Sequence, residues 1–173
     1  MQYVKLFIFE ILLGYILQSV GSMICLYAFS GKKIEIRQFT FLTLVNAVAV
    51  YAIRHINNIT FGIHTLLIML VIILLGISVV RASINASALS ALITMVTITV
   101  GEVVNYLILN LMYDDETLHL ILKDDTTMNG KISKAIAVIP SNVFFIIIML
   151  IIFKQSRKKS KDKEIGKISE TNS

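Results

Sequence analysis

The chain has 173 residues, of which 56% are hydrophobic and 16% are charged, and its formal net charge is +5. A soluble domain of this size carries roughly 25% charged residues, so the composition excludes an ordinary soluble protein and indicates a single hydrophobic domain. The one cysteine, Cys25, excludes an internal disulfide and a CxxC redox pair.

Long apolar runs separated by short polar breaks predict an all-α fold, a polytopic transmembrane helix bundle. The run Phe61 to Val80 has 20 residues and no Lys, Arg, Asp or Glu. Because a helix rises about 1.5 Å per residue and the hydrocarbon core is about 30 Å thick, this run is long enough to cross a bilayer once. Five spans are predicted in the domain 1–153, at about 6–29, 38–53, 61–80, 84–112 and 135–153.

Three of these spans carry further expectations. The segment 6–29 is too long for the apolar region of a cleavable signal peptide and has no small-x-small site after it. The segment 38–53 is only about 24 Å long as a helix, so it is either a full span extended by snorkelling of Arg37 and Arg54, or a helix in the interface. The segment 84–112 is long enough to tilt or to project past the membrane.

Basic residues collect on alternate breaks and predict the orientation. Lys32, Lys33 and Arg37 follow the first span, Arg81 follows the third, and the tail 154–173 holds seven basic residues against three acidic ones. With five spans these regions share one side, which the positive-inside rule makes the cytoplasm. We therefore expect a multi-pass protein of the bacterial cytoplasmic membrane, with its N-terminus outside and its C-terminus inside.

The segment 154–173 carries +4 of the net charge of +5, so the charge predicts a cytoplasmic anchor on the lipid bilayer and no nucleic-acid binding. Its low hydrophobicity predicts disorder from about residue 160 onward. The tail residues expected to contact anionic lipid or a partner are Lys158, Lys159, Lys161 and Lys163.

Charged and polar residues inside the apolar runs are the candidate site. Glu10, Arg54, His64, Glu102 and Pro140 lie on five different spans, and the predicted topology puts all of them in the outer half of the membrane. Three interpretations stay open: Glu102 is only an interhelical clamp with Arg54 or His64, the cluster lines a polar pocket open to the outside, or it forms a proton relay.

Neighbouring residues add to this cluster. Asn105 lies three residues after Glu102 and shares its helix face, while Gly14, Gln18 and Gly21 recur at helical spacing after Glu10. Small residues let another helix approach, and polar ones can hydrogen-bond across the contact. Pro140 cannot donate a helix hydrogen bond, so within a span it would leave the carbonyl of Ile136 free.

No catalytic motif supports an enzyme. The chain has no HExxH, GxSxG or phosphate-binding GxxxxGK[ST] sequence, and Cys25 is predicted to lie far from the histidines. The acidic residues of the outer loop 113–134 lack the spacing of an EF-hand, so we expect no metal and no cofactor.

Short motifs carry one resemblance. Arg54, the sequence Thr60-Phe-Gly-Ile-His-Thr65 and the sequence Gly101-Glu-Val-Val-Asn105 resemble the multi-helix sensor region of Gram-positive GHKL-type sensor histidine kinases, those related to detectors of peptide pheromones. The resemblance covers roughly residues 1–153. In that family a cytoplasmic kinase part follows, whereas here 20 residues without histidine follow Phe153. The resemblance therefore implies a sensor-like module that binds a ligand, pairs with a complete histidine kinase, or is a truncated relative.

Three functions remain in competition. The first is a membrane signalling module whose outer pocket binds a ligand or another membrane protein. The second is the small substrate-binding membrane subunit of an energy-coupling vitamin transporter, although such subunits usually have six helices and little cytoplasmic tail. The third is a structural membrane partner whose polar residues only pack helices together.

Overall fold

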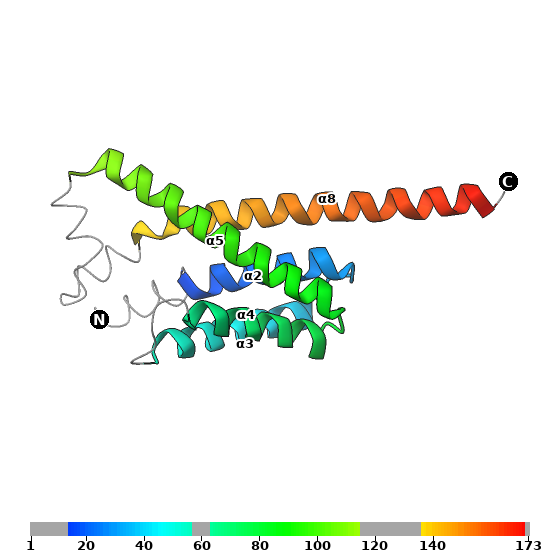
Figure 1. The fold of residues 1–173 in the computed structure, drawn as a ribbon, viewed down its shortest axis with the longest axis horizontal. Helices are drawn as coiled ribbons and strands as arrows, with labels where there is room; N and C mark the ends of the chain where they lie inside the picture. The colour runs from blue at the N-terminus through cyan, green and yellow to red at the C-terminus, as the bar shows by residue number, and fades with distance from the viewer. Residues whose placement is uncertain (1–13, 57–62, 115–135, 172–173) are drawn as a thin grey trace.

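The computed structural model describes residues 14–56, 63–114 and 136–171, and from residue 159 onward only the backbone. Every regular element in these residues is a helix, as predicted (Figure 1). Glu10, the loop segment 115–135 and the short segment 57–62 lie outside the described residues. The helices are α2 (Leu17–Ser30), α3 (Ile36–Arg54), α4 (Ile63–Ser78), α5 (Ile84–Met112) and α8 (Ile139–Thr171).

Helix α2 is the centre of the bundle. It packs against α8, α5 and α3, while α4 packs on α5 and α3. Met23, Leu26 and Tyr27 of α2 are completely buried in the main apolar cluster. Figure 1 shows α5 crossing the bundle obliquely and α8 extending well past the other helices toward its C-terminal end.

The bundle exposes apolar side chains and buries polar ones. Leu66 and Leu111 are 64% and 87% exposed, whereas Ser19, Asn46 and Ser90 are completely buried. Lipid solvates an apolar exterior, and small or hydroxylated residues let membrane helices approach closely, so this distribution is that of a membrane helix bundle. Of the helices in the described residues, three are long and apolar enough to cross a membrane: Ile36–Arg54, Ile84–Met112 and Ile139–Lys158.

The lengths of two helices differ from the prediction. Helix α3 has 19 residues, about 28 Å, because it begins at Ile36 and includes both flanking arginines. Helix α4 has 16 residues in the described part of the chain, Ile63–Ser78, and ends before the apolar run does. The segment 38–53 is therefore part of a helix of spanning length, and the helix in the run 61–80 ends two residues before the run does.

A compact connection ends α4. The amides of Val80 and Ala82 donate to the carbonyls of Leu75 and Gly76 at 3.3 and 2.9 Å, which turns the chain out of the helix. Arg81 adopts a left-handed conformation with φ 55°, and the Ser83 side chain caps α5 by accepting from the amide of Ala86. This turn explains why the apolar run outlasts the helix.

The side chain of Gln38 joins three helices at this end of the bundle. Its Nε2 donates to the carbonyl of Val79 at 2.9 Å, and its Oε1 accepts from the hydroxyl of Tyr27 at 2.8 Å. The end of α2, the start of α3 and the end of α4 therefore lie together.

The carbonyls at the C-terminal end of α2 are bonded by α8. Gly31 ends α2 with φ 65°. Ser156 donates its hydroxyl to the carbonyl of Ala28 at 2.6 Å, and Arg157 donates to the carbonyls of Gly31 and Lys32. Terminal carbonyls of a helix lack intrahelical partners, so these bonds fasten α8 to the end of α2.

Helix α8 continues through the basic tail to Thr171, where the sequence predicted disorder from about residue 160. Its tail, residues 154–173, is rich in lysine, which has good helix propensity, and contains no proline. Extending an existing helix avoids the costly nucleation step, so a segment with no apolar core of its own can continue a helix that begins in the bundle.

Candidate ligand pocket

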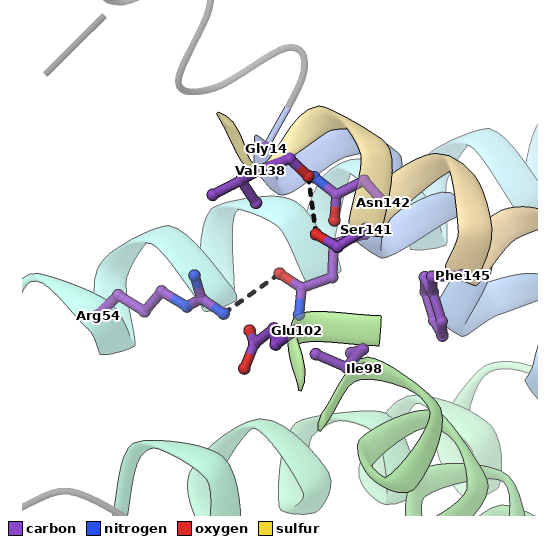
Figure 2. Close-up of a pocket in the computed structure, with 9 residues that line it drawn as sticks. Gly14, Arg54, Ile98, Glu102, Val138, Ser141, Asn142 and Phe145 are labelled. Atoms are coloured by element: carbon purple, nitrogen blue, oxygen red, sulfur yellow. Dashed lines mark hydrogen bonds between the residues drawn. The ribbon is translucent and has the colours of Figure 1, made fainter. Parts of the chain in front are cut away.

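A small open pocket lies among α2, α3, α5 and the start of α8, at the end of the bundle where α3 ends (Figure 2). Its volume is about 40 Å³, and a water-sized site needs about 10–15 Å³, so the space corresponds to about three water molecules. The residues that line it are Gly14, Gln18, Arg54, Ile98, Glu102, Val138, Ser141, Asn142 and Phe145.

Arg54, the last residue of α3, is oriented by aromatic and polar neighbours. Its Nη2 donates to Oε1 of Gln18 at 3.4 Å. Its Cζ lies 5.6 Å from the centre of the Tyr15 ring, and Tyr15 in turn packs edge-on against Tyr51. A guanidinium is attracted to the face of an aromatic ring, so these contacts hold the cation at the mouth of the pocket.

Glu102 of α5 lines the same pocket and is exposed. Figure 2 shows its carboxylate and the Arg54 guanidinium on the same side of the pocket. Within the described part of the chain the two side chains form no ion pair, and the Arg54 guanidinium donates instead to Gln18. The structure thus brings together two of the charged residues that the sequence singled out, with no ion pair between these two.

Asn105 has a different environment from Glu102 although the two share a helix face. Its side chain is buried, and Nδ2 donates to the carbonyl of Ala137 at 2.8 Å. Its Oδ1 is buried without a hydrogen-bond partner among the described residues. Asn105 therefore joins α5 to the chain just before α8 and does not line the pocket.

Pro140 is the second residue of α8 and is exposed, so its missing amide falls in the first turn of the helix and not in its interior. The helix is interrupted at Val138, and the first turn of a helix tolerates a proline because its amide has no partner there. The carbonyl of Val138 accepts from the hydroxyl of Ser141 at 2.8 Å and from the amide of Asn142 at 3.3 Å.

The other predicted residues are not at the pocket. His64 is half-buried near the start of α4 and does not line the cavity. Lys158 is exposed on α8, far along the chain from the pocket, and only the backbone of Lys159, Lys161 and Lys163 is described. Among the described residues there is no group of three or more His, Cys, Asp or Glu side chains that could hold a metal ion.

Sequence reasoning missed the α8 side of the pocket. Ser141, Asn142 and Phe145 line it, and the Phe145 ring also packs on Gly21 so closely that a Cβ there would overlap it. The polar pair directly after Pro140, in an otherwise apolar run, was the available signal. For Phe145 the sequence gives none, because apolar residues surround it on both sides.

Comparisons with known proteins give no match: no family model, no curated protein and no solved structure is similar to this chain.

Proposed function

We propose that this protein is an integral membrane signalling module that binds a ligand or a partner through the pocket of Arg54 and Glu102. The observation that carries the proposal is the course of α8. This helix lines the pocket near its start and continues, as one helix, through the basic tail to Thr171. A change at the pocket thus has a direct physical route to the tail.

The proposed topology has five spans, with the N-terminus outside and the C-terminus in the bacterial cytoplasm. Its support is that the three basic regions lie at one end of the bundle. The Arg157 bond to Lys32 places the α2–α3 connection beside the tail, and the Gln38 bond to Val79 places the turn at Arg81 beside the start of α3. Positive residues near span ends favour the cytoplasmic side, so this end is assigned inward and the pocket outward.

The motif resemblance supports a sensor-like role. Arg54 and Glu102 both belong to the short motifs that resemble the sensor region of GHKL-type histidine kinases, and both line the pocket. The proposed partner is a complete histidine kinase or another membrane protein that contacts the α8 tail through Lys158 and its neighbours. In this proposal the chain itself catalyses nothing.

Two contacts of α8 with α2 define the coupling. Near the pocket the Phe145 ring lies on Gly21, and near the tail Ser156 and Arg157 bond the carbonyls that end α2. A ligand that prefers another position of α8 shifts the helix about the first contact and changes the second. The tail then reports occupancy of the pocket.

Thermal-shift screening followed by a distance measurement tests this function. Purified protein in nanodiscs is screened with peptides, amino acids and vitamins, because a ligand of the folded form raises the apparent Tm. Spin labels at Lys32→Cys and Lys158→Cys, in a Cys25→Ala background, then report the α2–α8 separation. We expect a ligand that raises Tm to change this distance, and Arg54→Gln to remove both effects.

Two results would contradict the signalling role. A ligand that raises Tm at the pocket but leaves the label distance unchanged would show binding without coupling. Uptake of that ligand into proteoliposomes, with a partner ATPase present, would identify a transport subunit instead.

A further inference from the structure

The pocket presents one full charge of each sign. The cation comes from the end of α3 and the anion from the middle of α5, and within the described residues the two groups are not paired with each other. Charged side chains inside a membrane lose much of their hydration, so two opposite charges there are normally paired with each other. Arg54 and Glu102 therefore keep their capacity to bind charged groups of a guest (Figure 2).

Arg54 is suited to an anionic group. Its bond to Gln18 is 3.4 Å long, whereas an ordinary N–H···O bond is about 2.9–3.0 Å, and the acceptor is a neutral amide. A guanidinium has five donors in a planar fork that matches a carboxylate or a phosphate. Because Tyr15 already holds the guanidinium plane, little side-chain freedom is lost when an anion replaces the long bond.

Glu102 is suited to an ammonium group. An ionised carboxylate only accepts hydrogen bonds, and a primary ammonium offers three donors. An anionic guest bound at Arg54 would be repelled by Glu102 unless it also carried a positive charge. The two residues together thus favour a guest with both charges over one with either charge alone.

The size of the cavity limits the guest. About 40 Å³ holds a few heavy atoms. Besides the charged pair, the lining includes polar Gln18, Ser141 and Asn142 and apolar Ile98 and Phe145. A bulky side chain has to remain outside the enclosed part. The geometry fits a small head group rather than a whole peptide.

We propose that the pocket recognises a zwitterionic group that carries an anion and a primary ammonium, with the anion on Arg54 and the ammonium on Glu102. The proposal rests on the proposed ligand-binding function and names the chemistry of its ligand. Two sources share this chemistry: a free amino acid, and the head group of an ethanolamine phospholipid.

The experiment compares glycine with its two blocked forms. Protein in phosphatidylcholine nanodiscs, which contain no primary ammonium, is titrated calorimetrically with glycine, N-acetylglycine and glycinamide. A second set of nanodiscs replaces half of the lipid by phosphatidylethanolamine, and its apparent Tm is compared with that of the first set. We expect glycine to bind at least tenfold more tightly than either blocked form, or the ethanolamine lipid to raise Tm. The first result identifies the free amino acid as the source and the second identifies the lipid.

Charge-neutral variants test whether Arg54 binds the anionic group of the ligand and Glu102 its ammonium group. Arg54→Gln and Glu102→Gln should each weaken glycine binding, or the lipid effect, at least tenfold, while Arg54→Lys and Glu102→Asp should retain part of it. Arg37→Gln and Glu35→Gln are matched controls, because both are exposed near the opposite end of α3, and they should bind as wild type. The Tm of each variant without ligand shows that it folds.

Three outcomes would overturn the zwitterion proposal. The first is equal binding of glycine and a blocked form, the second is wild-type binding by both neutral variants, and the third is no effect of glycine or of the ethanolamine lipid. A screening ligand of other chemistry that still moves α8 would leave the signalling function intact, so failure of this proposal is distinguishable from failure of the function.

Discussion

Gly21 shows how one missing side chain fixes the position of a helix. A Cβ at this position would lie 2.7 Å from Cδ1 of Phe145 and closer still to Cε1, and the Phe145 ring is almost completely buried. We predict that Gly21→Ala lowers the free energy of unfolding by about 1–3 kcal/mol, the usual cost of overpacking. Thermal unfolding in nanodiscs measures it.

Gly14 is the matched control for this variant, since a Cβ there meets nothing within 4 Å. Gly14→Ala should leave Tm unchanged or slightly raised. Phe145→Leu should recover part of the loss in the Gly21→Ala background, because residues in contact couple. Equal Tm values for Gly21→Ala and Gly14→Ala would show that α8 is free to move away from α2.

Asn46 and Ser19 test the polar interior. Both side chains are completely buried, and Nδ2 of Asn46 donates to Oγ of Ser19 at 3.0 Å. Interhelical hydrogen bonds in membranes average about 0.6 kcal/mol and reach about 1.7 kcal/mol. We predict a coupling within this range from a double-mutant cycle of Asn46→Ala and Ser19→Ala. Additive effects would mean that the bond contributes nothing to the α2–α3 contact.

At the level of residues, the sequence identified the charged half of the pocket. Arg54 and Glu102 stand out because charge is rare inside apolar runs, and the structure puts both on one cavity. His64 was grouped with them by depth alone, but depth ignores rotation about the helix axis. Asn105 is only about 60° around α5 from Glu102, yet it is buried against Ala137 while Glu102 is exposed.

At the level of elements, the junction of α2 with α8 is the most specific contact. Arg157 donates to the carbonyls of Gly31 and Lys32, and its guanidinium lies 5.1 Å from the Phe153 ring centre. We predict that Arg157→Gln broadens the Lys32–Lys158 label distance by freeing the end of α8. The loss of stability should stay within about 1 kcal/mol, because Arg157 is partly exposed to solvent.

Lys154→Gln is the control for this variant, because the substitution also removes one positive charge. Lys154 is exposed and lies about one turn earlier on α8. Its distance distribution should match that of the wild type. Equal broadening in both variants would mean that net charge at the tail, rather than the bonds to α2, positions α8.

The ends of the helices were less predictable than their existence. Charged residues were taken as span boundaries, which cut α3 short, although Arg37 and Arg54 belong to the helix. Helix α4 ends at Ser78, where the amides of Val80 and Ala82 bond its last carbonyls. Just after the helix, the distant Gln38 side chain bonds the carbonyl of Val79. Contacts of this kind depend on the packed bundle, and no local pattern in the sequence encodes them.

At the level of the whole molecule, the arrangement of the bundle supports one orientation in the membrane. The connection at Lys32, the turn at Arg81 and the tail at Arg157 lie at one end, and the pocket lies where α3 ends, at the other. Moving basic residues across a bilayer is costly, so the proposed orientation keeps the end that carries them in the cytoplasm.

We therefore predict accessibility from outside at one end only. In intact cells, in a Cys25→Ala background, a membrane-impermeant thiol reagent should label Asp125→Cys and should label Lys32→Cys and Lys158→Cys only after permeabilisation. Wild-type protein is the control, because Cys25 is completely buried and should stay unlabelled throughout. Labelling of Lys32→Cys but not Asp125→Cys in intact cells would show that the protein has the opposite orientation, with the pocket facing the cytoplasm. In that case its ligand would have to be intracellular, and α8 would carry its signal outward.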